Sequence, residues 1–157
     1  MNNELIELKA TLPTDKIKKE TFTEKFQLAY TTQKNFVKCG VMGWCFEVIW
    51  TGFGNMLEHD KTLSSSTSLL MFPIYGMAAF ISPIYSVVKD KPIFFRGILY
   101  TMLIFTAEFF SGMFLKKLDM CPWDYSHSPY NIKGIVRLDY APAWFAVGLI
   151  YEKILKH

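Results

Sequence analysis

The amino-acid sequence predicts an all-α fold: an integral membrane four-helix bundle with a polar N-terminal arm and a structured Pro/aromatic loop between the third and fourth helices. Two observations carry this prediction. Of the 157 residues, 51% are hydrophobic and 17% are Phe, Trp or Tyr. The apolar residues gather into long runs after a polar start, and residues 62–88 hold no charged side chain at all. Long uncharged runs of this kind are typical of membrane-spanning helices.

The polar arm, residues 1–34, is expected in the cytoplasm, apart from a transmembrane domain of residues 35–157. Residues 14–34 are expected to form an amphipathic helix on a membrane surface, with four apolar side chains against lipid or protein. These side chains are Ile17, Phe22, Phe26 and Ala29. A mostly solvated arm is the alternative. Because no basic segment followed by an apolar one opens the chain, the first apolar run is expected to be a retained anchor.

Four apolar segments follow the arm, and a hydrocarbon core about 30 Å thick needs about 20 residues of helix to cross it. The predicted spans are residues 36–55, 69–88, 93–115 and 140–155. The fourth is short. A soluble helical bundle is the alternative, but a chain this small has little polar structure with which to cover apolar faces of such length.

Lysine and arginine residues set the expected orientation. The cytoplasmic set comprises the arm, Lys38, the turn with Lys89, Lys91 and Arg96, and the pair Lys153 and Lys156. The outside set comprises Lys61, Lys116, Lys117, Lys133 and Arg137. This bias favours both termini in the cytoplasm, and we expect a bacterial cytoplasmic membrane. Arg96, near the cytoplasmic end of its span, is expected to extend to lipid headgroups.

Two acids inside predicted spans are the main candidates for function. Glu47 lies about 16 Å into the first span, and Glu108 about 22 Å into the third, at 1.5 Å per residue. Such an acid costs about 2.5 kcal/mol or more on insertion scales, so it is expected to face protein, water or a partner. The first and third spans run in the same direction, which places the two acids at nearby depths. They form either a polar pathway for a proton, cation or basic solute, or neutral and hydrogen-bonded groups that fix helix register.

Small and polar residues share helix faces with these acids, as in membrane helices that approach each other closely. Thr51 and Thr101 are the further candidates for the polar pathway. The predicted helix-packing residues are Gly40, Gly43, Gly54, Gly97, Gly112 and Gly148. Glu152, which lies beside Lys153 at a membrane edge, is expected to have a structural role.

The segment MCPWDYSHSPYN, residues 120–131, is the most polar and aromatic part of the apolar half. Asp124 and Asn131 are suited to binding backbone N–H groups of a turn, and the aromatic residues to a membrane interface. The loop motif comprises Trp123, Asp124, Tyr125, Ser126, Asn131 and Gly134. A membrane enzyme with Asp124 and His127 as an acid–base pair is the alternative. Because the neighbouring prolines favour irregular backbone, no catalytic residue is assigned.

Several classes of function have no support in the sequence. The P-loop pattern GxxxxGK[ST] is absent, and the histidines and cysteines show neither HxxxH nor CxxC spacing. We therefore expect no metal site and no cofactor. The net charge of +3 is mild, and the lysines cluster beside apolar segments. Nucleic acid is for this reason not an expected partner.

Four sequence motifs occur in a recognisable order: GWCFEVIW (43–50), FPIYGM (72–77), TAEFFSG (106–112) and CPWDYSHSPYNIKGIVRLDYAPAWF (121–145). They resemble the family of small membrane proteins catalogued as putative ABC-transporter type IV, the CmpB-type permeases, which includes the transmembrane protein 229 group. The likeness covers roughly residues 36–155. It implies a multi-span transporter permease-like subunit in the lipid bilayer. With four spans and no attached ATPase domain, transport requires a homo-oligomer and a separate ATPase subunit. A non-transporting scaffold or regulatory protein is the alternative.

Overall fold

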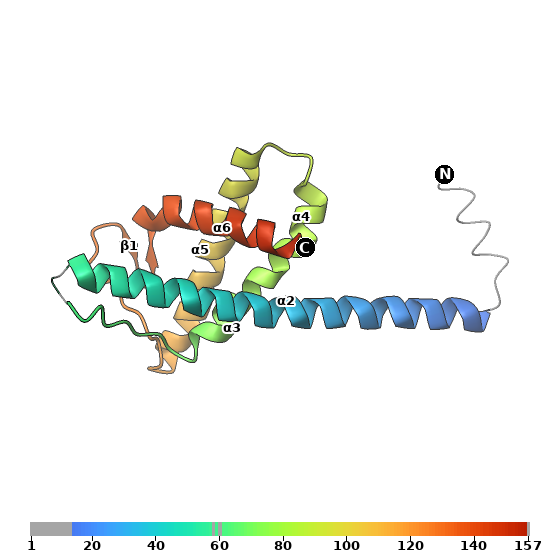
Figure 1. Cartoon of the computed structure of the whole chain (residues 1–157), viewed down its shortest axis with the longest axis horizontal. Coiled ribbons are helices and arrows are strands. Elements are labelled where there is room, and N and C mark those ends of the chain that lie inside the picture. The colour runs from blue at the N-terminus through green and yellow to red at the C-terminus, as the bar shows by residue number, and fades with distance from the viewer. Residues whose placement is uncertain (1–13, 58, 60, 157) are drawn as a thin grey trace. The chain divides into compact units, whose positions relative to one another are not determined.

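The computed structural model describes residues 14–57, 59 and 61–156, and it is mostly helical (Figure 1). The chain divides into two units, Met1–Lys34 and Asn35–His157. Helix α2 (Thr14–Leu57) supplies the described part of the first unit and the beginning of the second. Each unit is described by itself below.

In the first unit, the helix expected over residues 14–34 is present. Phe26 has 60% of its surface exposed, and Leu28 and Tyr30 are exposed to a similar degree. Ala29 is exposed as well, whereas the side chains of Ile17 and Phe22 lie outside the described residues. The described apolar side chains of this stretch are therefore exposed, and its placement on a membrane surface stays a prediction.

The second unit holds the remaining helical elements and one small sheet. In chain order these elements are α3 (Met71–Gly76), the 3₁₀ helix η1 (Met77–Phe80), α4 (Ile81–Val88), α5 (Ile93–Lys117), strands β1 (Asn131–Ile132) and β2 (Val136–Arg137), the 3₁₀ helix η2 (Leu138–Tyr140) and α6 (Ala141–Leu155). The helices expected at 93–115 and 140–155 are thus present with small shifts at their ends.

Two segments of the described residues are long and apolar enough to cross a membrane, Met71–Val88 and Ile93–Lys117. The predicted spans 36–55 and 140–155 do not meet the same criterion. The mean hydropathy of the first segment is lowered by its glycines and by Lys38 and Glu47. The second, α6, has 15 residues and a length of about 22 Å, less than the hydrocarbon thickness of about 30 Å. A bundle of four membrane-crossing helices is therefore a proposal, taken up below.

The predicted span 69–88 is not one continuous helix. Pro73 and Pro83 are each the third residue of their helices, α3 and α4, and η1 joins the two. A proline in a first helical turn removes an N–H group that has no partner within the helix, so it begins a helix at little cost. The same ring prevents a single ladder of hydrogen bonds from passing through both sites. The 3₁₀ stretch between them is the result.

Helix α5 ends in a well-defined cap. Asp119 has a φ of 53°, in the left-handed region. The N–H of Met120 donates to the carbonyl of Leu115, and the N–H of Asp119 donates to that of Lys116. This is the Schellman arrangement, which satisfies the last carbonyls of a helix, here with aspartate in the position where glycine is commonest. The chain turns away from α5 at this point and enters the Pro/aromatic loop.

Helices α5 and α6 are in extensive contact, and α6 crosses α5 (Figure 1). A Cβ atom added to Gly97 of α5 would lie 2.2 Å from the ring of Phe145 in α6. One added to Gly148 of α6 would lie 2.6 Å from Cβ of Tyr100 in α5. Each helix thus offers a glycine to an aromatic side chain of the other, and the two backbones approach closely as a result.

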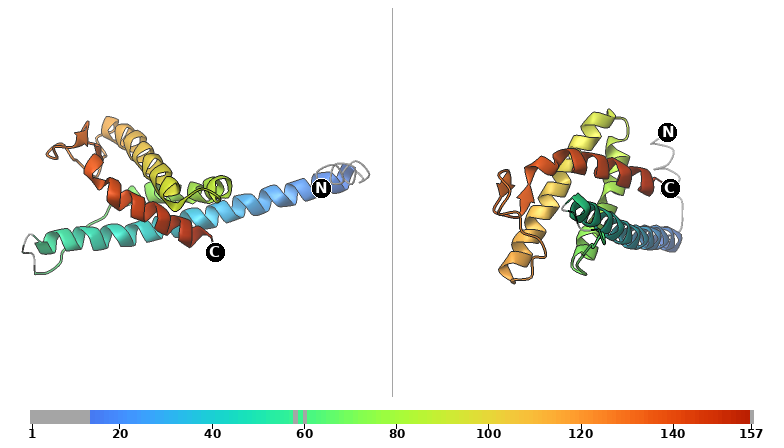
Figure 2. Two further views of the ribbon diagram at one scale, coloured as in Figure 1. Left: turned by 90° about the horizontal axis from the view of Figure 1, so that it is seen from above. Right: turned by 60° about the vertical axis from the view of Figure 1, so that its left-hand side comes forward.

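A second reciprocal pair joins α2 to α3. Gly40 lies against the ring of Phe72 and Gly43 against the ring of Tyr75, while Gly76 of α3 lies against the ring of Phe36 in α2. Helix α6 also contacts α2, because the Tyr151 hydroxyl donates to the carbonyl of Cys39 at 3.2 Å. Figure 2 shows α6 beside both α5 and the Asn35–Leu57 part of α2. The buried core, made of Cys39, Ala79, Ile81, Tyr100 and Tyr151, lies where these helices meet.

A short antiparallel hairpin follows α5, and no strand was predicted from the sequence. Strands β1 and β2 pair Asn131 with Arg137 and Ile132 with Val136. The turn has two central residues with positive φ, Lys133 at 54° and Gly134 at 68°, and the N–H of Ile135 donates back to the carbonyl of Ile132. Positive φ at both positions is the mark of a type I′ turn, whose twist matches that of paired strands.

Candidate functional site: an acid–aromatic cluster

Glu108 is the most enclosed of the predicted pathway residues. It lies in the interior of α5 with 9% of its surface exposed. Its carboxyl group faces the indole of Trp144 in α6 and the hydroxyl of Tyr125 in the loop. Even so, Oε2 of Glu108 and Nε1 of Trp144 are both buried without a hydrogen-bond partner. Buried polar atoms in this state are uncommon in native proteins and call for a physical explanation.

Glu47 occupies a more open position on α2, where it is half-buried. The hydroxyl of Thr67 donates to its Oε2 at 2.5 Å. The hydroxyl of Tyr75, on α3, lies beside the same carboxylate. Thr67 is exposed, so one side of Glu47 faces the surface and the other faces the bundle interior.

Tyr125 lies between the two acids. It is within electrostatic reach of Glu108 and of Glu47, and the pKa of its hydroxyl is raised first by burial and then by Glu108. A further increase in that pKa comes from Tyr140, whose ring lies 5.8 Å from the ring of Tyr125, and then from Glu47. Tyr125 is thus a shared neighbour of the two acids, and no hydrogen bond joins Glu47 to Glu108 within the described part of the chain. The similar depth of the two acids stays a prediction.

These groups make up what we call the acid–aromatic cluster. It comprises Glu47, Tyr75, Glu108, Tyr125, Tyr140 and Trp144, from α2, α3, α5, the loop, η2 and α6. Ring contacts extend it further, since Tyr140 lies 5.8 Å from Trp50 and 6.3 Å from Trp144. Every helical region of the second unit except η1 and α4 thus contributes a side chain to one polar and aromatic interior.

The loop motif holds Tyr125 in this position. The N–H of Tyr125 donates to the carbonyl of Gly134 at 2.8 Å, and the indole N–H of Trp123 donates to the carbonyl of Ile135 at 2.9 Å. Asn131 accepts a hydrogen bond from the N–H of Gly134 at 2.8 Å. Ile135 has 1% of its surface exposed and lies against Gly112 of α5. The hairpin therefore anchors the loop to α5, and the loop in turn directs Tyr125 toward Glu108.

Asp124 stabilises the turn in the loop through hydrogen bonds. Its Oδ1 accepts hydrogen bonds from the hydroxyl of Ser126 at 2.5 Å and from the N–H of Ser126 at 3.0 Å. These two bonds, first the hydroxyl and then the N–H, lower the pKa of Asp124 below its ordinary value of 3.8. No hydrogen bond links Asp124 to His127 in the described residues. The geometry is that of an Asx turn and gives no support to an acid–base pair.

Thr51 and Thr101 are placed differently from the expectation. The Thr51 hydroxyl donates to the carbonyl of Glu47 at 2.9 Å, and the Thr101 hydroxyl donates to the carbonyl of Gly97 at 2.8 Å. Both bonds lie within the residue's own helix, a common way to satisfy a hydroxyl in an apolar setting. Thr51 also lies 3.4 Å from the carbonyl of Ser66, and the role of the two threonines in the polar pathway stays a prediction.

The predicted packing glycines separate into two groups. Gly40, Gly43, Gly97 and Gly148 lie against aromatic side chains of neighbouring helices, and Gly112 lies against the hairpin. Gly54 differs, because a Cβ atom added there would have no heavy atom within 4 Å. Small residues on a helical stripe are thus good predictors of close approach only where the neighbouring helix extends alongside them.

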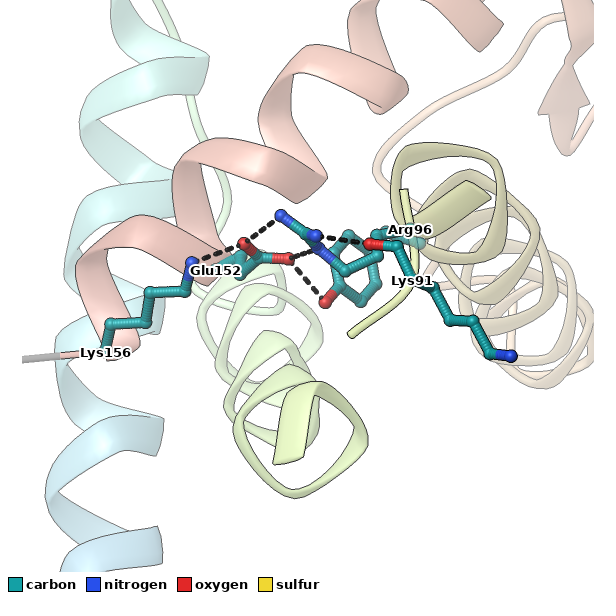
Figure 3. A network of polar contacts seen from close by, with 5 residues as sticks. Lys91, Arg96, Glu152 and Lys156 are labelled. Atoms are coloured by element: carbon teal, nitrogen blue, oxygen red, sulfur yellow. Dashed lines mark hydrogen bonds and ion pairs between the residues drawn. The ribbon is translucent and has the colours of Figure 1, made fainter. Parts of the chain in front are cut away.

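A second polar network, which we call the Arg96 network, lies at the opposite end of α5 (Figure 3). The carboxylate of Glu152 in α6 accepts hydrogen bonds from Arg96, from Lys156 at 2.8 Å and from the hydroxyl of Tyr100 at 2.7 Å. Arg96 also donates to the backbone carbonyl of Lys91 at 2.7 Å, while the side chain of Lys91 points away. The expectation that Arg96 extends to lipid headgroups is wrong, because its guanidinium is engaged inside the protein.

Among the described residues, no group of three or more His, Cys, Asp or Glu side chains could hold a metal ion. The candidate site is therefore the acid–aromatic cluster, and its components are acids, phenols and an indole. Groups of this kind bind and exchange protons or attract cations inside a membrane.

The fold and this interior are those of a small helical protein with apolar helices of membrane-spanning length. Residues 34–157 match the family described as Putative ABC-transporter type IV, and the chain belongs to that family. The match covers the whole acid–aromatic cluster and the Arg96 network and leaves the N-terminal arm outside. No solved structure matches the chain.

Proposed function

We propose that the protein is the membrane-embedded, permease-like subunit of a transport assembly, and that the acid–aromatic cluster is the polar part of its path. The observation that carries the proposal is Glu108: a buried acid on an apolar helix of 25 residues, with one carboxylate oxygen that has no partner. An acid in such a position is costly in a membrane and is retained where it serves a substrate or ion. Membership of the family supports the same role.

The proposal includes four membrane crossings with both termini in the cytoplasm. Met71–Val88 and Ile93–Lys117 supply two crossings. Residues 36–55 of α2 and the shorter α6 supply the others. Residues 36–55 lie against α3, and α6 lies against α5, through the glycine contacts, which supports their placement in one bundle. The Pro/aromatic loop then lies on the outer side, where its hairpin closes the bundle.

The source of energy is proposed to be a separate ATPase subunit. The family supports such a partner, and the sequence has no P-loop pattern. We expect the full-length chain, purified from its native membrane, to retain an ATPase whose hydrolysis rate rises in lipid vesicles that contain both subunits. Recovery of an unrelated enzyme instead, with no ATPase, would favour a scaffold or regulatory protein.

Substitution of the two acids tests the path itself. Glu108→Gln and Glu47→Gln are expected to abolish the rise in ATP hydrolysis rate in vesicles that contain both subunits, while leaving the association with the ATPase intact. Asp139→Asn is the matched control, because that acid is exposed and paired with Arg137 on the surface. If both cluster variants behave like Asp139→Asn, the cluster is not part of a transport path.

The topology is tested with Cys121, which is partly exposed in the loop. In a variant that keeps only this thiol, with Cys39→Ala and Cys45→Ser, an impermeant maleimide is expected to label intact cells. Labelling that requires permeabilised cells would invert the proposed orientation.

A further inference from the structure

Residues 63–68 have no regular secondary structure, and they return along α2 after that helix has ended (Figure 1). We call them the Ser/Thr strip, because every residue of the segment after Leu63 is a serine or a threonine. Hydrogen bonds attach the strip to α2 residues that are three or four positions apart and therefore share one face of the helix. The bonds join Asn55 to the Ser64 carbonyl at 2.6 Å, Thr51 to the Ser66 carbonyl at 3.4 Å, Glu47 to the Thr67 hydroxyl at 2.5 Å and Trp44 to the Ser68 carbonyl at 3.0 Å.

The strip follows α2 over about half the thickness of a membrane. Asn55 and Trp44, its first and last partners on α2, are separated by about 16 Å of helix at 1.5 Å per residue. Gly52 lies under the strip, since a Cβ atom added there would be 3.5 Å from Cβ of Ser65. In the four-span arrangement, Asn55 lies at the outer end of the first span. The strip therefore extends from this outer end to near the middle of a hydrocarbon core about 30 Å thick.

The strip presents polar groups to its surroundings. Residues 64–67 are exposed. In the part of the chain that the structure describes, the backbone N–H groups of Ser65, Ser66 and Thr67 donate no hydrogen bond. Lipid tails supply no acceptor for such groups, and irregular backbone at membrane depth occurs only where protein covers it or where it lines water. Lipid is thereby excluded as the neighbour of the strip.

Water fits the strip better than a second copy of the chain does. The exposed large side chains of the spans are apolar, Phe53 of α2 and Phe110 of α5 among them. A copy packed through such side chains would offer no acceptor to the strip, and each buried polar group left without a partner costs about 1–3 kcal/mol. Water satisfies the hydroxyl and N–H groups together.

We propose that the Ser/Thr strip lines a water-filled entrance through which the outer solution reaches the carboxylate of Glu47. This inference rests on the proposed function, because it needs residues 36–55 to lie in the membrane, and it adds the outer entrance of the path. Thr67 connects the entrance to the acid, since its exposed hydroxyl donates to Oε2 of Glu47. Carbonyl and hydroxyl oxygens replace part of a hydration shell, so the entrance suits small hydrated ions and polar solutes.

Cysteine labelling of the full-length protein in its native membrane tests the entrance. Ser66→Cys and Thr67→Cys each provide one thiol in a chain that has no other, which requires Cys39→Ala, Cys45→Ser and Cys121→Ser. An impermeant, charged methanethiosulfonate reagent is added on the side from which Cys121 is labelled in the chain that keeps that thiol. The result then does not depend on the orientation of the protein.

Ile49→Cys is the matched control. Ile49 has 67% of its surface exposed and lies between Glu47 and Thr51 in α2, on the opposite face of the helix. Ser66→Cys and Thr67→Cys are each expected to react at least about tenfold faster than Ile49→Cys, because the reactive thiolate forms in water and not in hydrocarbon.

Two other outcomes separate the entrance from the membrane placement. Rates in both strip variants as low as that of Ile49→Cys would mean that protein covers the strip, which overturns the entrance and leaves the four-span arrangement standing. An equally high rate for Ile49→Cys would place residues 36–55 outside the membrane, which overturns the four-span arrangement and the entrance with it.

Glu47→Cys tests whether the entrance reaches the acid. This variant is expected to react from the same side as Ser66→Cys and Thr67→Cys. Modification of the native Glu47 by a water-soluble carbodiimide, located by mass spectrometry, is expected to give the same result without a substitution. An unreactive position 47 in both experiments, beside reactive strip variants, would show that the water ends before the acid and would overturn the proposal.

Discussion

Arg96 of α5 holds both carboxylate oxygens of Glu152 in α6, from Nε to Oε2 at 2.8 Å and from Nη2 to Oε1 at 3.1 Å. The two residues are 56 positions apart in the chain, and 4% of the Glu152 side-chain surface is exposed. Lys156 and Tyr100 complete the shell around the carboxylate. The relationship fixes one end of α6 on α5, the end opposite to the acid–aromatic cluster.

Removal of one partner of this pair is expected to be costly. Arg96→Ala leaves a buried carboxylate with less compensation, and breaking a buried pair in this way typically lowers the free energy of unfolding by about 3–5 kcal/mol. Unfolding by denaturant in detergent micelles, followed by circular dichroism, measures the change. Arg137→Ala breaks an exposed pair with Asp139 and is expected to cost about 1 kcal/mol or less. Equal losses in the two variants would mean that the Arg96 network does not stabilise the bundle.

The glycine contacts between α5 and α6 predict a second difference. In Gly148→Ala, the new methyl group lies 2.6 Å from Cβ of Tyr100, an atom fixed to the backbone of α5. The helices must move apart, which we expect to lower the free energy of unfolding by about 1–3 kcal/mol. Gly54→Ala is the control, because the open surroundings of Gly54 leave only the helix preference for alanine. That variant is expected to be up to about 1 kcal/mol more stable than the wild type.

The hairpin turn offers two neighbouring positions with opposite expected effects. Gly134 has a φ of 68°, and a Cβ atom there would lie 2.4 Å from Oγ of Ser126. Gly134→Ala is therefore expected to loosen the loop and to speed labelling of the Cys121 thiol. Lys133 has a φ of 54°, so Lys133→Gly removes backbone strain and is expected to leave labelling unchanged or slower. Faster labelling in both variants would contradict the assigned turn.

The loop is also expected to respond to acid through Asp124. Its pKa in the folded protein is below the ordinary value of 3.8, because the hydroxyl and N–H of Ser126 bind the charged form. The stabilisation is present above about pH 4 and is lost as the pH falls through the lowered folded-state pKa. Cys121 is therefore expected to become more accessible to a disulfide reagent at strongly acidic pH. Asp124→Asn should remove this pH dependence, and an unchanged profile in that variant would assign it to another group.

The sequence predicted α5 and the apolar segment 71–88 well because both have strong local signals, whereas it did not predict that the arm and the first apolar segment form one helix, α2. Pro92 precedes α5, and apolar runs fill α5 and residues 71–88. Pro73 and Pro83 indicated a kinked helix in this segment, but not the 3₁₀ form of the stretch between them. A proline shows where a ladder of hydrogen bonds is interrupted, but the geometry between two such points depends on packing against α5 and α6.

Parts of the site followed from sequence, and parts required the fold. Helical spacing predicted Glu47 and Glu108 as interior residues. It did not predict that Tyr75 and Trp144 lie beside these acids, because the two aromatic residues belong to other helices. The hairpin carried a weak local signal that was missed: a short glycine-containing segment, Lys133 to Ile135, separates two short apolar stretches, a pattern that is found in hairpin loops. The pairing of Arg96 with Glu152 could not be predicted either, since no local sequence pattern links Arg96 to an acid 56 positions away.

The contacts of Lys38 bear on how many times the chain crosses the bilayer. Its Nζ donates to the carbonyl of Ile154 at 2.9 Å, so the first turn of the Asn35–His157 unit touches the last turn of α6. A chain that enters and leaves a membrane at neighbouring points on one face has crossed it an even number of times. In the proposed four-span arrangement, this contact places both ends of the Asn35–His157 unit on one face of the membrane, and two reporter halves fused at those ends are expected to meet on the same side.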